Sequence, residues 1–131
     1  MSEFTAGKYR EWNENISGAL VVAATDGDTV LKVARNATTT IFIQKIIFWV
    51  TTDAAQSISF EDTASTPVSI AKVPTSPGTS TRWEFDFGAK GRPLTEGKNF
   101  NMNVSAAGLA GSLEWEGYQR LTSATALSSA A

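Results

Sequence analysis

The sequence contains neither cysteine nor histidine. Without cysteine the chain has no disulfide, no thiolate nucleophile and no sulfur ligand for a metal ion. Without histidine it lacks the Ser-His-Asp triad, imidazole metal ligands and the side chain that most often acts as a general base near neutral pH. These two absences exclude the commonest catalytic and metal-binding arrangements. We therefore expect no catalytic residue, no cofactor and no metal site, and we do not expect an enzyme.

Charge and long apolar runs are also scarce. Charged residues make up 18% of the chain and the net charge is −2. The basic residues are scattered, whereas binding of nucleic-acid phosphates needs clustered Lys and Arg. The longest apolar run, residues 46–50, is far shorter than the roughly 18 residues of a membrane span, and the first residues do not resemble a secretory signal. We expect no nucleic acid and no membrane among the partners, and synthesis in a cytoplasm.

The pattern of the chain is that of short strands. A length of 131 residues suits one domain. Apolar β-type runs recur about every ten residues between turns rich in glycine, proline and asparagine, with no long helical period. This pattern predicts an all-β fold, an antiparallel β-sandwich with the eight strands of a jelly roll. We place this domain at residues 16–121, a short N-terminal arm at residues 1–15 and a flexible C-terminal tail at residues 122–131.

Alternation of apolar and polar residues predicts which side chains enter the core. It is clearest over residues 81–87, where aromatic residues share one face and charged residues the other. The side chains predicted to point inward are Ile58, Phe60, Val68, Ile70, Trp83, Phe85, Phe87, Phe100, Met102, Val104, Leu113 and Trp115.

The Asp26-Gly27 dipeptide is a strong hairpin signal. It predicts that residues 19–25 and 29–35 form adjacent strands of one hairpin. Asp26-Gly27-Asp28 also resembles the start of a calcium loop, but Ala37 stands where an EF-hand needs its bidentate glutamate. The hairpin turn is the simpler interpretation.

The run at residues 46–50 is apolar on both faces of a strand. In an antiparallel sheet the second apolar face must be covered, either by the edge of the other sheet or by a neighbouring copy. We predict Phe48 and Trp49 as oligomer contacts, while a place for Trp49 in the core stays open.

Three large aromatic rings stand in the short arm, at Phe4, Tyr9 and Trp12. They pack either onto the domain or onto another chain. Because aromatic anchors carry much of the binding energy of interfaces, we predict that these three residues bind a partner.

Two pairs of carboxylates are the best candidates for chemistry. Glu84 and Asp86, and likewise Glu114 and Glu116, lie two residues apart in strand-like runs. That spacing places same-face side chains ~6–7 Å apart, within the range of glycosidase acid and base pairs. A small glycan hydrolase is thus an alternative. The solvent face of half-buried strands explains the same residues more simply.

The last third of the chain carries a resemblance. Residues 83–88 (WEFDFG), 91–98 (GRPLTEGK), 103–111 (NVSAAGLAG) and 116–118 (EGY) resemble the closing hairpins of small virion proteins of tailed bacteriophages. Within that group the sequence is most similar to the jelly-roll head decoration (cement) proteins. The likeness extends over residues 56–121 and rests on turn residues.

The resemblance implies a virion structural protein made in the host cytoplasm. It would sit as a homotrimer on the exterior of the capsid, bind the major capsid protein and stabilise the expanded shell. The trimer follows from the resemblance alone. The alternative is a carbohydrate- or receptor-binding β-sandwich module of a phage tail or fibre, with one tryptophan on an exposed rim.

Overall fold

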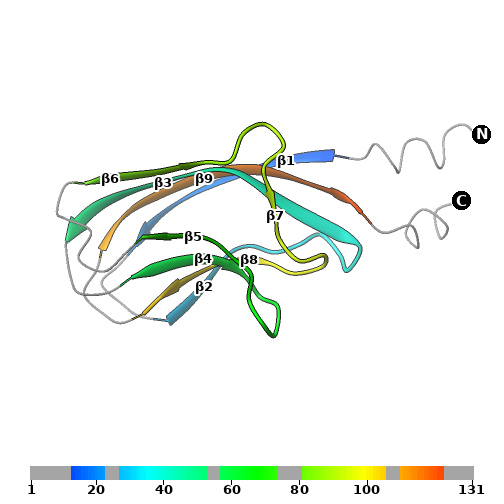
Figure 1. Ribbon diagram of the computed structural model, residues 1–131, viewed down its shortest axis with the longest axis horizontal. Coiled ribbons are helices and arrows are strands. Elements are labelled where there is room, and N and C mark those ends of the chain that lie inside the picture. The colour runs from blue at the N-terminus through cyan, green and yellow to red at the C-terminus, as the bar shows by residue number, and fades with distance from the viewer. Residues whose placement is uncertain (1–12, 23–26, 53–56, 74–80, 106–109, 123–131) are drawn as a thin grey trace, which may run out of the picture.

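The computed structural model describes residues 13–22, 27–52, 57–73, 81–105 and 110–122, and these residues form two packed β-sheets (Figure 1). In the described segments no helix has the length and apolar character needed to cross a membrane. The nine strands are β1 Asn13–Val22, β2 Gly27–Lys32, β3 Thr39–Thr52, β4 Ile58–Asp62, β5 Ser69–Val73, β6 Arg82–Asp86, β7 Arg92–Pro93, β8 Phe100–Val104 and β9 Ala110–Leu121.

The two sheets have the strand order of a jelly roll. The larger sheet runs β1-β9-β3-β6, and the smaller sheet runs β2-β8-β4-β5. All pairings are antiparallel, and the chain crosses repeatedly from one sheet to the other. This order confirms the predicted fold class. The two-residue β7 is an addition to the eight expected strands and pairs with β3 opposite Phe42 and Ile43. Its Pro93 is tolerated because β7 is a short edge piece.

The predicted hairpin between residues 19–25 and 29–35 is wrong. β1 belongs to the larger sheet and pairs with β9, whereas β2 belongs to the smaller sheet and pairs with β8. Residues 23–26, including Asp26, lie outside the described residues. The turn signal is local, but the partners of both strands come from the last third of the chain, where they bury more apolar surface than a two-stranded hairpin can.

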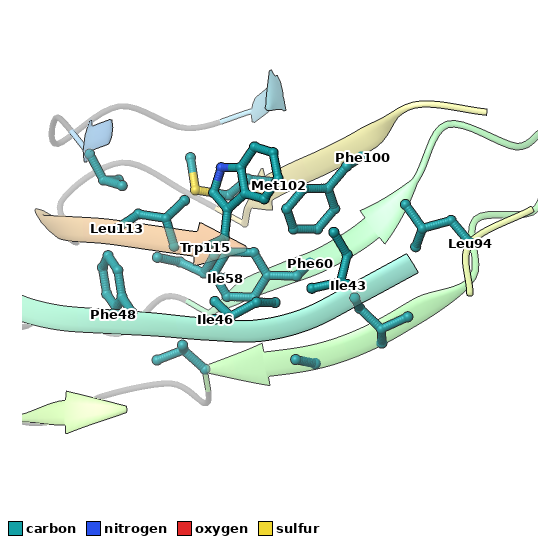
Figure 2. Close-up of a cluster of buried hydrophobic side chains, with 14 of the residues drawn as sticks. Ile43, Ile46, Phe48, Ile58, Phe60, Leu94, Phe100, Met102, Leu113 and Trp115 are labelled. Carbon is teal, nitrogen blue, oxygen red and sulfur yellow. The ribbon is translucent and has the colours of Figure 1, made fainter. Parts of the chain in front are cut away.

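The core fills the space between the sheets (Figure 2). Phe60 and Phe100 have no exposed surface, and the Phe100 ring meets the edge of Trp115 at 5.3 Å between centroids. Burial of each such side chain stabilises the fold by about 1.5–3 kcal/mol. The inward positions confirmed as buried are Ile58, Phe60, Ile70, Phe100, Met102, Val104, Leu113 and Trp115. The rings of Trp83, Phe85 and Phe87 are partly buried against this core.

Val68 is the exception among the inward predictions, since 43% of its surface is exposed. β5 begins only at Ser69, so Val68 lies in the preceding turn. Its N–H donates to the Asp62 carboxylate at 3.0 Å, and this polar contact rather than alternation sets its orientation.

Residues beside both expected domain boundaries take part in the sandwich. β1 begins at Asn13, so the last three residues of the expected arm belong to the sandwich. Thr122, expected in the tail, donates its N–H to the Thr38 carbonyl at 2.9 Å. Phe4, Tyr9 and Trp12 lie outside the described residues, as do residues 123–131.

A buried carboxylate ties together one end of the sandwich. Asp62 has no exposed surface. Its Oδ1 accepts hydrogen bonds from the N–H groups of Ala64 and Val68, and its Oδ2 accepts from the N–H of Thr95 at 2.9 Å and the Thr95 hydroxyl at 2.6 Å. Burial by itself would raise the pKa of Asp62, but the hydrogen bonds from Thr95, Val68 and Ala64 outweigh it and hold the pKa below its ordinary 3.8.

We expect Asp62→Asn to destabilise the fold by about 2–3 kcal/mol at pH 7. Both oxygens of Asp62 accept hydrogen bonds, and in the variant the NH₂ group of the amide would replace one of them and face N–H or O–H donors. The folded pKa lies below 3.8, so the carboxylate stabilises the fold above that pH and loses its contribution as the pH falls through the folded value. The gap between wild type and variant should therefore shrink toward pH 3. Urea unfolding at a series of pH values measures it.

The matched control is Asp86→Asn, because an exposed asparagine can still accept the hydrogen bond from the Gly88 N–H. We expect it to change stability by about 0.5 kcal/mol or less. Equal losses in the two variants would contradict the role given to Asp62.

Candidate functional site

The outer face of the larger sheet is the candidate functional surface. It is the side turned away from the core, and its residues come from β6, β3, β9 and β1. Alternation along β3 turns Ile46, Phe48 and Val50 inward and leaves Ile47 and Trp49 on this face. The strand register arranges the face in three rows: Arg82, Trp49, Ser112 and Val21; Glu84, Ile47, Glu114 and Ala19; Asp86, Lys45, Glu116 and Ser17.

The register separates the two predicted oligomer contacts. Phe48 is 0% exposed, whereas Trp49 is 47% exposed. The Phe48 side chain is enclosed by the core and cannot meet a second copy of the folded chain, so this part of the prediction is corrected. Trp49 keeps the exposure that a contact residue requires.

Arg82 lies over Trp49 and belongs to a chain of ion pairs on this face. The Arg82 guanidinium lies 5.7 Å from the centroid of the Trp49 ring and 2.6 Å from Glu84 Oε1. Lys45 Nζ lies 3.3 Å from Glu84 Oε2. Hydrogen bonds first from Arg82 and then from Lys45 lower the pKa of Glu84. These contacts hold Arg82 against the indole ring, so a planar cation and an aromatic ring are presented together.

Glu84 does not have the raised pKa that the acid of a glycosidase pair requires, since its pKa is lowered. Glu114 and Glu116 are exposed side chains of β9, as the alternation predicted. In the part of the chain that the structure describes, no three acidic, histidine or cysteine residues gather as a metal site.

At the other end of the face, the aromatic side chains contact each other and neighbouring residues of the same chain. Phe42 stacks on Tyr118 with 4.8 Å between ring centroids and 9° between planes. The Arg120 guanidinium covers Phe42 at 5.1 Å, and the Tyr118 hydroxyl donates to the Lys90 carbonyl at 2.6 Å. Aromatic surface is therefore available for a partner mainly at the Trp49 end.

A shallow hollow lies over the Ile47 and Lys45 rows of the face. It has a volume of about 550 Å³ and is lined by β1, β3 and β9, including Ala19, Ile47 and Glu114. On β1 the small outward side chains of Ser17 and Ala19 line it. Val21, at the edge of the same face, is 80% exposed. An open face with an apolar stripe and a charged margin suits the docking of a macromolecule better than the enclosure of a small substrate.

Sequence reasoning missed several residues of this surface. The stacking of Arg82 on Trp49 and the exposure of Val21 were not anticipated. The two-residue period of Lys45, Ile47 and Trp49 was the available signal, since these residues share a face. Trp115 lies in the core as predicted, and Trp83 packs against the core while partly exposed.

Comparison with known proteins finds similarity in structure and none in sequence family. No family model matches the sequence, and no curated protein matches it. A chain of the acidic stable capsid structure of Helicobacter pylori bacteriophage KHP30 is similar with a TM-score of 0.50 and 14% identity, covering 82% of this chain and 93% of that chain.

Two further solved structures are similar at lower scores. The crystal structure of PirA has a TM-score of 0.49 at 8% identity and covers 76% of this chain and 92% of that chain. The crystal structure of the STIV MCP has a TM-score of 0.46 at 8% identity and covers 90% of this chain and 44% of that chain. A similar fold occurs in the bacteriophage KHP30 capsid structure.

We expect alanine substitutions at the two neighbouring residues to have very different effects. Phe48→Ala removes a fully buried ring and should cost about 3–5 kcal/mol. Trp49→Ala removes a half-exposed ring and one cation–π contact, and should cost about 1 kcal/mol. Urea unfolding of dilute protein measures both, each variant serving as the control of the other. A loss at Trp49 as large as that at Phe48 would place Trp49 in the core of the single chain.

Proposed function

We propose that this protein is a structural protein of a bacteriophage virion that decorates the exterior of the head and stabilises the expanded shell. The observation that carries the proposal is the open outer face of the jelly roll, with Trp49 half exposed among the ion pairs of Arg82, Glu84 and Lys45. The resemblance of residues 56–121 to head decoration proteins supports it. The fold shared with a chain of a phage capsid structure is consistent with it.

The physical logic of such a protein needs a rigid body and contacts, and it needs no chemistry. A ligand that binds only the expanded form of a shell stabilises that form by its differential affinity. A sandwich whose core fills the space between two sheets supplies rigidity. The arm with Phe4, Tyr9 and Trp12 supplies anchors for the major capsid protein, because aromatic side chains are the usual hot spots of interfaces.

Self-association into a trimer would use the outer face of the larger sheet. Trp49, Ile47 and Val21 provide its apolar surface, and the margin carries both charge signs. Three linked copies multiply weak contacts to the shell into a high avidity without any new type of contact.

We expect the wild-type protein to have the mass of three chains in light scattering. Trp49→Glu should give the mass of one chain with an unchanged circular dichroism spectrum, because a carboxylate would be desolvated in the contact. The control is Val33→Glu, since Val33 is 64% exposed but lies outside this face. A wild-type protein of single-chain mass, or a trimeric Trp49→Glu variant, would refute the contact.

We expect replacement of Phe4, Tyr9 and Trp12 by alanine to weaken binding to expanded heads of the encoding phage at least tenfold, a loss of about 1.4 kcal/mol or more. Co-sedimentation with heads measures it. Melting temperature and solution mass of this triple variant should equal those of the wild type. Unchanged binding to heads would remove the arm from the interface.

The exposed ring of Trp49 also favours a second candidate, a carbohydrate- or receptor-binding module of a tail or fibre. Sugars stack on open aromatic faces. Here the Arg82 guanidinium already lies over the ring of Trp49, which leaves less of it for a sugar. Quenching or enhancement of tryptophan fluorescence by oligosaccharides, lost in Trp49→Ala, would favour this candidate over the decoration protein.

A further inference from the structure

A narrow turn between β6 and β7 rises from the outer face of the larger sheet (Figure 1). It consists of Gly88, Ala89, Lys90 and Gly91. Gly88 and Gly91 have φ angles of 79° and 73°, and the N–H of Gly91 donates to the Gly88 carbonyl at 3.1 Å. Apart from Lys90 the turn has no side chain larger than a methyl group, so it forms a thin ridge on the face.

Side chains of the sheet hold this turn in place. Gln44 Nε2 donates to the Ala89 carbonyl at 2.6 Å, and the Tyr118 hydroxyl donates to the Lys90 carbonyl at 2.6 Å. Lys90 itself is exposed. Because a segment that is already ordered loses little conformational entropy on binding, the turn is suited to enter a contact.

A second cation, Arg120, lies at the same end of the face. Its guanidinium covers the aromatic stack that includes Tyr118. Neither Lys90 nor Arg120 forms an ion pair with another described residue. Glu96, an acidic residue near this end, accepts a hydrogen bond from the Thr122 hydroxyl instead. The Tyr118 end of the face therefore carries both the raised turn and unpaired positive charge.

The middle of the same face is hollowed and acidic. The hollow over the Ile47 and Lys45 rows continues into a second one of about 350 Å³, and the two share Ser17 and Glu116 in their linings. We call them together the recess. Glu114 and Glu116 line it, are exposed and form no ion pair with a described residue. Lys45, which also lines it, is paired with a carboxylate of β6.

The charges of the basic end and of the recess do not meet within one copy. Glu114 and Glu116 precede Arg120 on β9, which places them about 20 and 13 Å from it along the strand. Exposed charges farther apart than about 8 Å are largely screened at physiological salt. Among the described residues no ion pair joins Lys90 to either glutamate. Two copies can satisfy these charges, because each copy carries both parts of the pattern.

We propose that the basic end of one copy binds the recess of the next, with the turn of residues 88–91 in the recess and Lys90 and Arg120 facing its carboxylates. The inference rests on the proposed function, because it specifies the contact of the trimer. The contact joins two different parts of the outer face, so it is heterologous and forms a ring when three copies are related by rotation. Ile47, which lines the recess, and Trp49 in the next row supply its apolar part.

The test reverses the charges on each side of the contact separately. One variant carries Lys90→Glu and Arg120→Glu, and the other carries Glu114→Lys and Glu116→Lys. Each should weaken trimer formation at least about tenfold, because like charges then face each other across the contact. Sedimentation equilibrium over a dilution series measures the dissociation, and circular dichroism shows that each variant folds. The wild-type trimer should also dissociate more readily as the NaCl concentration rises.

A variant with all four substitutions separates a direct contact from a structural effect. Its turn and recess again carry opposite charges, with the signs exchanged, so association should return to within about threefold of wild type. The matched control carries Lys32→Glu and Lys72→Glu, on two strands of the smaller sheet, and should associate like wild type. Failure of the combined variant to recover, or an equal loss in the control, would overturn the proposal.

The results also separate this contact from the proposed function. A wild-type trimer that neither pair of reversals weakens would overturn the contact and leave the decoration function standing. Recovery of the trimer in the combined variant, with no binding of the wild-type trimer to expanded heads, would support the contact and remove the function. A wild-type protein of single-chain mass at every concentration would overturn the contact and the trimer together.

Discussion

The insertion of β9 between β1 and β3 is the constraint on which the rest of the structure depends. It joins the first described strand of the chain to the last, so the larger sheet is complete only when both ends of the domain are in place. Gly111 and Gly117 permit the close approach, because a Cβ at either would collide with the carbonyl oxygen of Trp49 or Phe42 on β3. When β9 is paired in the sheet, its side chains Leu113 and Trp115 pack in the core that the larger sheet shares with the smaller sheet.

The same pairing places alternate residues of β3 in the core and on the outer face. A shift of the register by one residue would exchange the two faces of β3, and it would expose Phe48 while burying Trp49. The register is therefore fixed by the core, and the composition of the outer face follows from it.

Neighbouring carboxylates at the end of β4 differ in their surroundings. Asp62 is buried but receives hydrogen bonds from Thr95, Val68 and Ala64, and its pKa is lowered. Glu61, one residue earlier, faces the opposite side of the sheet and forms no hydrogen bond with another described residue, and burial raises its pKa. The Asp62 carboxylate links β4 to the turn at Thr95 by hydrogen bonds.

The sequence by itself determined the all-β class, the jelly-roll expectation and most of the core, because the alternation that buries Phe60, Phe100 and Trp115 is a local property of a strand. The tertiary structure alone decided which strands pair. It sent β1 and β2 to different sheets despite the turn signal at Asp26-Gly27, and it decided which apolar face of β3 met the core. The physical reason is that pairing is settled by burial between distant segments, whose free energy no local pattern contains.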